Sequence, residues 1–190
     1  MSLGYWETLI SQKVDGPTLT AGTQASAINA IARYTMAANR LRESDVLHIK
    51  ASGRLSTAVT TPGNSSWSLT WGVNSATKIF DTLPLLGNTT VQTTVPWHLE
   101  AEGIVRAVGT TANIFWQGLV ASTAFLNVAA VATGPYAGVV TVPFNTAPVV
   151  GVNFDATAAT IIDFCFTQTT ATSSMICHNY VLSLKTSSGF

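Results

Sequence analysis

Glu100 and Glu102 are the carboxyl groups of this sequence whose spacing suits acid–base catalysis. Side chains alternate along an extended strand, so residues two apart point to the same face. Glycoside hydrolysis uses two carboxyl groups roughly 5–10 Å apart. The spacing therefore permits a hydrolase that acts through these two residues, although the basic side chains expected beside them favour charge pairing instead.

The histidines His48, His98 and His178 do not stand in a metal-binding spacing such as HExxH. His48 and His98 would come close if their strands pair, and with Glu100 they would imitate a set of metal ligands. A single histidine on a strand is more commonly a surface or core residue, so we expect no metal site. The sequence also has no phosphate-binding loop, no dinucleotide fingerprint and no G-x-S-x-G motif. We therefore expect no cofactor and no enzymatic activity.

Cys177 and His178 are adjacent and suggest a nucleophile with its base. Cys177, however, falls on an expected strand, and it follows Ala171 at the same distance at which Cys165 precedes it. A hairpin with its turn near Ala171 would bring the two thiols together. Two small core thiols and a cross-strand disulfide are both compatible with this spacing, and in a reducing cytosol the thiols would stay free.

Two long strands are predicted to carry most of these side chains. Within Val46–Ala58 and within Val95–Gly109, apolar or small residues alternate with polar ones. This period of two is typical of half-buried strands. We expect the outward basic side chains of the first strand to face the acidic ones of the second, with His48, Lys50 and Arg54 opposite Glu100 and Glu102.

Shorter strands are expected between turn sequences. They are Trp67–Trp71, Lys78–Leu86 with an interruption at Pro84, Ala112–Val120, Val139–Pro143, and a final hairpin of Ala159–Thr167 with Ser174–Leu184. Trp67, Trp71 and Trp97 fall on the apolar phases of their strands, which predicts core positions. About eight short strands with almost no helical periodicity predict an all-β fold, a single β-sandwich, with a jelly roll as the favoured arrangement.

Residues 1–45 lack a regular pattern and are expected to form an N-terminal arm and lead-in segment, followed by the β-sandwich domain over residues 46–190. The alanine-rich stretch Ala25–Ala38 is compatible with a short helix. The arm could lie on a neighbouring subunit or fold back on its own domain, because termini are loose unless something ties them down. The expected assembly contacts are Tyr5, Trp6, Leu9, Ile10, Arg33, Arg40 and Arg42.

The charge content of the chain is low. Charged residues make up 9%, against about 25% in ordinary soluble domains, and the formal net charge is zero. From Ala107 to Phe190, a span of 84 residues, only Asp155, Asp163 and Lys185 are charged. A free surface of this size would normally carry many ions, whereas the cores of subunit interfaces are poor in charge. The composition favours a protein that assembles, and it argues against direct nucleic-acid binding, which needs clustered Lys and Arg.

No segment is expected to direct the chain into a membrane. Met1–Ile10 lacks the basic start and apolar core of a signal peptide. The apolar stretch Ile114–Ala132 contains several polar residues and has no basic flanks, which argues against a membrane span.

Three segments resemble small virion structural proteins of tailed bacteriophages: Leu47–Ser56, Pro96–Gly109 and Ser174–Leu182. The resemblance implies a jelly-roll-like sandwich, frequently trimeric, on the capsid or the tail. Our first expectation is a capsid decoration (cement) protein, made in the host cytoplasm and placed on the capsid surface of the virion. Its partners would be itself, as a homotrimer, and the major capsid protein. The alternative is a tail or head-fibre module that binds a host receptor or glycan through loops such as Ala121–Gly138.

Overall fold

The computed structural model describes residues 6–57, 63–88, 90–125, 138–144, 146, 150–170 and 173–186. They form strands and one short 3-10 helix, η1 (Ala30–Ala32). The strands are β1 (Trp6–Ser11), β2 (Ala25–Ser26), β3 (Tyr34–Met36), β4 (Val46–Thr57), β5 (Asn64–Trp71), β6 (Lys78–Asp81), β7 (Leu85–Leu86), β8 (Gln92–Ala107), β9 (Asn113–Ser122), β10 (Val139–Val142), β11 (Thr160–Gln168) and β12 (Ser174–Lys185). Within the described ranges, no helix is long and apolar enough to cross a membrane.

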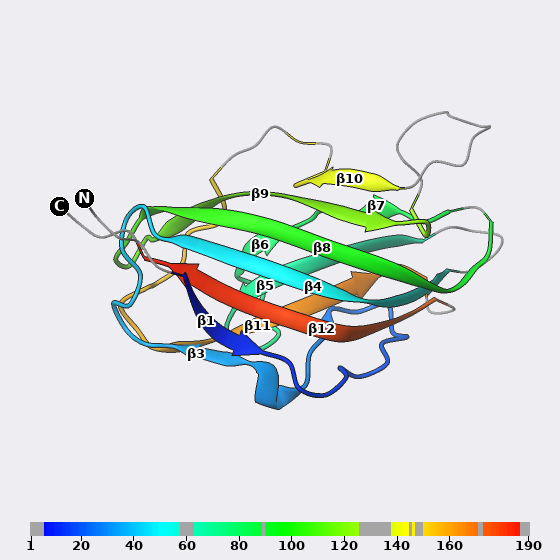
Figure 1. Cartoon of the computed structure of the whole chain (residues 1–190). Helices are drawn as coiled ribbons and strands as arrows, with labels where there is room; N and C mark the ends of the chain where they lie inside the picture. The colour runs from blue at the N-terminus through cyan, green and yellow to red at the C-terminus, as the bar shows by residue number, and fades with distance from the viewer. Residues whose placement is uncertain are drawn as a thin grey trace.

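The strands build two antiparallel six-stranded sheets that pack face to face (Figure 1). Sheet A has the order β1-β12-β4-β8-β9-β10. Sheet B has the order β2-β11-β5-β6, with β3 also paired to β11 and β7 to β5. The all-β sandwich predicted from the alternating sequence pattern is confirmed.

The two long predicted strands are β4 and β8, and they pair with each other inside sheet A. His48 lies opposite Glu102 and Lys50 lies opposite Glu100, as the charge pattern predicts. The prediction is wrong for Arg54, which lies opposite Pro96. The apolar residues between them point into the sandwich, where they are buried: Leu47, Ile49, Ala51, Leu55, Trp97, Leu99 and Ala101. Alternation therefore assigns the inner and outer faces of both strands correctly.

The core is centred on tryptophan. Trp67 is fully buried and packs against Trp97, Phe125 and Phe166, with ring centroids 4.9, 5.6 and 5.1 Å apart. These aromatic contacts join the two sheets, and they confirm the core positions predicted for Trp67 and Trp97. Trp71 is only partly buried and lies at the periphery of this core.

The N-terminal segment contributes strands to both sheets. β1 pairs with β12, while β2 and β3 pair with β11. Residues 6–45 therefore lie on their own domain, which is one of the two alternatives left open above, and the domain boundary at residue 45 stays a prediction. The short helix expected within Ala25–Ala38 is wrong, because only the three residues of η1 are helical. Pairing with β11 outweighs the helix propensity of alanine, which is worth only a few tenths of a kcal/mol per residue.

The predicted C-terminal hairpin is also wrong. β11 belongs to sheet B and β12 to sheet A, so the chain crosses the sandwich between them. Phe164 and Tyr180 instead stack across the core, with ring centroids 5.2 Å apart. Each strand instead pairs along most of its length with another strand, β11 with β5 and β12 with β4. Cys165 and Cys177 consequently lie in different sheets, and both thiols are buried and free.

Candidate functional site

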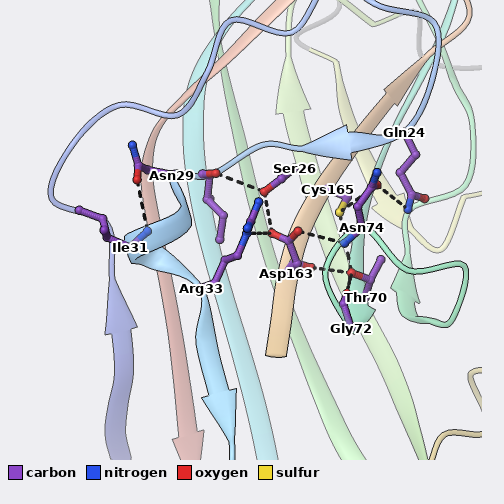
Figure 2. Close-up of polar contacts among 11 residues, drawn as sticks. Gln24, Ser26, Asn29, Ile31, Arg33, Thr70, Gly72, Asn74, Asp163 and Cys165 are labelled. Atoms are coloured by element: carbon purple, nitrogen blue, oxygen red, sulfur yellow. Dashed lines mark hydrogen bonds and ion pairs between the residues drawn. The ribbon is translucent and has the colours of Figure 1, made fainter. Parts of the chain in front are cut away.

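Asp163 is a carboxylate in the middle of sheet B and is fully buried. Its neighbours in β11, Ile162 and Phe164, point into the core, so the Asp163 side chain points to the outer face of the sheet. Segments from elsewhere in the chain cover it there (Figure 2). A charged side chain that is buried away from water is tolerated only when it is paired with an opposite charge and hydrogen-bonded.

The partners of Asp163 come from three parts of the chain. Ser26 Oγ donates a hydrogen bond to Oδ1 over 2.7 Å, and Arg33 Nε lies 3.3 Å from the same oxygen. The backbone N–H of Asn74 donates to Oδ2 over 3.1 Å. We call Ser26, Arg33, Asn74 and Asp163 the Asp163 network. It fastens the N-terminal segment and the turn after β5 to the outside of β11 (Figure 2).

Further polar contacts extend this network. The Gln24 side-chain amide donates to Asn74 Oδ1 over 3.1 Å and to the Ser75 carbonyl over 3.0 Å. Thr70 Oγ1 donates to the Gly72 carbonyl over 2.7 Å. The turn after β5 is therefore held from both sides, by the N-terminal segment and by its own strand.

The Asp163 network also supports η1, which carries an exposed isoleucine. Asn29 caps the helix, because its side chain accepts a hydrogen bond from the Ile31 backbone N–H. Ala32 is buried in the core, and Arg33 follows immediately. Ile31 lies between these anchors with 65% of its surface exposed. In Figure 2 its side chain points away from the network.

An apolar cavity lies at the opposite edge of the sandwich, between β6 and the strands β9 and β10. It has a volume of about 270 Å³ and is lined mainly by apolar side chains, including Ile79, Phe80, Trp116 and Val152. Phe80 and Trp116 pack together with ring centroids 5.1 Å apart. Lys78 and Asp81 also line the cavity, and they form an ion pair of 2.7 Å. We call this the edge cavity.

The outer face of sheet A carries the carboxyl pair considered above. His48 Nε2 lies 3.0 Å from Glu100 Oε1, and His98 Nε2 lies 3.6 Å from Oε2. The hydrogen bond from His48 lowers the pKa of Glu100, with smaller contributions from His98 and Lys50. A general acid needs a raised pKa, so this geometry does not favour a hydrolase that uses Glu100 as its acid.

His48, His98 and Glu100 thus lie together as predicted, with both histidine side chains in contact with the Glu100 carboxylate. Among the described residues, no three His, Cys, Asp or Glu side chains meet in a way that could hold a metal ion.

The cysteines do not form a nucleophilic site. Burial raises the pKa of Cys177 to about 12 and that of Cys165 likewise to about 12. Both thiols are therefore protonated near neutral pH. His178 Nδ1 is bound to Asp15 at 2.9 Å on the other face of β12 from the Cys177 thiol, so the adjacent pair does not act together.

The residues predicted as assembly contacts are used in different ways. Trp6 is 49% exposed and packs edge-on against His48, and Arg42 is exposed. Arg33 and Arg40 make intramolecular ion pairs, to Asp163 and Glu7 respectively. Leu9 and Ile10 pack against the core of their own domain. Tyr5 lies outside the described residues.

Sequence reasoning missed Asp163, Ile31 and the edge cavity. A signal for Asp163 was present, because a lone carboxylate inside the apolar run from Ile161 to Phe166 requires a buried partner. Nothing in the sequence identifies Arg33 as that partner, since the contact joins residues 130 positions apart. The cavity and the exposure of Ile31 follow from strand order, which a single sequence does not contain.

Comparison with known protein families gives no match to this chain, and neither curated proteins nor solved structures match it.

Proposed function

We propose that this chain is a structural subunit of a virus particle, most simply a capsid decoration (cement) protein that stabilises the shell through subunit contacts. The observation that carries the proposal is the lack of charge along residues 107–190, which contribute strands to both sheets. Of the three charged residues between Ala107 and Phe190, Asp163 is buried, which leaves Asp155 and Lys185 at the surface.

Exposed apolar side chains occupy the same part of the chain. Among the described residues after 106 they are Val108, Leu119, Val139, Val150 and Val152. Val139 lies in β10, the last strand of sheet A, Val150 bridges to Phe115 of the neighbouring strand β9, and Val152 lines the edge cavity. Interface cores are depleted of charge, so a surface of this kind is suited to contact with other protein.

A jelly-roll arrangement is part of the proposal, and the strand order supports it. A jelly roll is one long antiparallel hairpin rolled into two sheets, so the first strand pairs with the last, the second with the second-last, and so on inward. The pairs β1·β12, β3·β11, β4·β8 and β5·β6 follow this rule. β9 and β10 would then be additions at the edge of sheet A.

The test is addition of the purified protein to capsids that lack it. The proposal expects saturable binding at a fixed ratio to the major capsid protein, and capsids that resist heat or osmotic shock better once decorated. Absence of binding would sink the cement role. Quantitative mass spectrometry of particles then gives the copy number, where near-stoichiometric amounts indicate a shell component and a few copies indicate a tail.

A second candidate function is binding of a host glycan. A shallow groove of about 410 Å³ on the outer face of sheet A is lined by side chains that include Glu100, Glu102, Phe115 and Gln117. Carboxylates and an amide can bind sugar hydroxyls, and the aromatic ring can pack on a sugar face. The loop Ala121–Gly138 lies mostly outside the described residues. Binding of the isolated protein to host cells, lost in Phe115→Ala, would favour this function over the first.

A further inference from the structure

Two complementary features lie on opposite edges of the sandwich. η1, with Ile31 at the surface, precedes β3 at the β2/β3 end of sheet B. The edge cavity is beside β6, which ends the same sheet on the other side. Figure 1 shows β3 and η1 at the bottom of the molecule and β10 at the top. A protrusion and a hollow on opposite edges cannot meet within one chain.

The backbone around Ile31 is fixed on both sides, although the Ile31 side chain is exposed. The Asn29 cap, the buried Ala32 and the Arg33–Asp163 ion pair fix the backbone on both sides of it. A side chain on a fixed support loses little conformational freedom when it docks, which favours binding. Ile31 is also the most exposed large apolar side chain among the described residues.

The edge cavity has the size and lining to accept such a side chain. An apolar protein cavity of roughly 150 Å³ holds a benzene molecule, and the edge cavity has about 270 Å³. Its walls include Ile79, Phe80 and Trp116, while Lys78 and Asp81 neutralise each other in an ion pair. An uncharged aliphatic group therefore suits it better than an ionic one.

We propose that Ile31 of one copy of this chain enters the edge cavity of the next copy. Such a head-to-tail contact uses two different surfaces, so it closes into a ring when the rotation between copies allows and otherwise continues as a filament. The formal net charge of zero means that copies do not repel one another. The inference rests on the proposed assembly function, for which it names the subunit contact.

The experiment is sedimentation velocity on the full chain and four variants. Ile31→Asp should weaken self-association by about 100-fold, because it would bury an unpaired carboxylate in the apolar cavity. Ile31→Val should retain association, since it keeps an aliphatic side chain. Val152→Trp should block the cavity and weaken association to a similar extent. Val14→Asp is the matched control, because Val14 is an exposed valine outside both features, and it should associate like the unmodified chain.

Mixing makes the test decisive. Ile31→Asp keeps an open cavity and Val152→Trp keeps the isoleucine, so the mixture should form 1:1 dimers through the one intact contact and grow no further. Absence of dimers from the mixture, or normal association of Ile31→Asp with circular dichroism unchanged, would overturn the proposal.

Two other outcomes separate this inference from the proposed function. If the unmodified chain stays monomeric up to roughly 100 µM yet binds capsids, the Ile31 contact is wrong and the cement role stands. If native mass spectrometry finds the cavity filled by a small apolar molecule and Ile31→Asp associates normally, the cavity is a ligand site and the contact is again wrong.

Discussion

On the outer face of sheet A, Lys50 and Glu102 are exposed, whereas Thr70 and Asp163 on the outer face of sheet B are fully buried. All four residues occupy outward positions in strands with the same alternation. The difference comes from Ser26 of the neighbouring strand β2 and from Gln24, Arg33 and Asn74, whose polar groups bond to Asp163 or to one another on the outer face of sheet B (Figure 2). A local pattern thus decides which side chains face outward, and distant segments decide whether water reaches them.

Thiol chemistry gives the largest expected contrast between the two faces. Cys165 points to the covered face, and burial raises its pKa to about 12. At pH 8 its thiolate fraction should be about a thousandfold below that of an exposed cysteine, whose pKa is about 8.5. Iodoacetamide should therefore modify Lys50→Cys, on the open face, about a thousandfold faster than Cys165. Peptide mass spectrometry resolves the two sites, and comparable rates would mean that sheet B is not covered.

Removal of the buried carboxylate should destabilise the fold strongly. In Asp163→Ala the N–H of Asn74 loses its acceptor and Arg33 loses its counter-ion, while the Ser26 hydroxyl keeps only the Ile28 carbonyl as an acceptor. Loss of one partner of a buried pair typically costs about 3–5 kcal/mol. Because the Arg33 side chain keeps 25% of its surface exposed, we expect a value near the lower end, about 3 kcal/mol.

Urea denaturation measures this change. Glu102→Ala, on the open face, is the control and should change the free energy of unfolding by less than about 0.5 kcal/mol. Equal effects of the two substitutions would contradict the distinction between the faces. Faster alkylation of Cys165 in Asp163→Ala would further show that the network holds the cover in place.

This contrast also explains which parts of the fold can be predicted from the sequence. Alternation in β4 and β8 predicts both strands, their inner faces and the pairing of Lys50 with Glu100, because those contacts follow from pleat and local register. The same rule fails for the C-terminal hairpin. β11 and β12 follow one another closely in the sequence, yet each pairs with strands far away in the chain. Which long-range partner wins depends on the whole sheet, and local periodicity does not contain that information.

A smaller contrast is expected for two threonines. Thr70 is buried and its hydroxyl donates to the Gly72 carbonyl over 2.7 Å, whereas Thr141 is exposed on β10. Thr70→Val keeps the shape and removes the donor, which should lower the free energy of unfolding by about 1 kcal/mol. Thr141→Val should change it by less than about 0.5 kcal/mol. If Thr70→Val left the free energy of unfolding unchanged, the polar contacts over sheet B would contribute little to stability beyond the Asp163 network.

The smallest effect is a pH dependence on the open face. The hydrogen bond from His48 lowers the pKa of Glu100 in the folded state below its ordinary value of 4.5. Its stabilising contribution is therefore fully present above pH 4.5 and is lost as the pH falls through the lowered pKa. Because 44% of the Glu100 side chain is exposed, solvent screening should limit the contribution to about 0.5 kcal/mol.

Glu100→Gln should accordingly lower the urea midpoint slightly at pH 7 and by less at about pH 3, because the stabilising contribution is lost as the pH falls through the lowered pKa of Glu100. Glu102→Gln provides the control for loss of a neighbouring carboxylate, because the described residues donate no hydrogen bond to that side chain, and it should leave the urea midpoint at pH 7 nearly unchanged. A destabilisation by Glu100→Gln that is equal at both pH values would mean that the His48 contact stabilises through packing. In that case the open face would depend on side-chain contacts in the same way as the covered face.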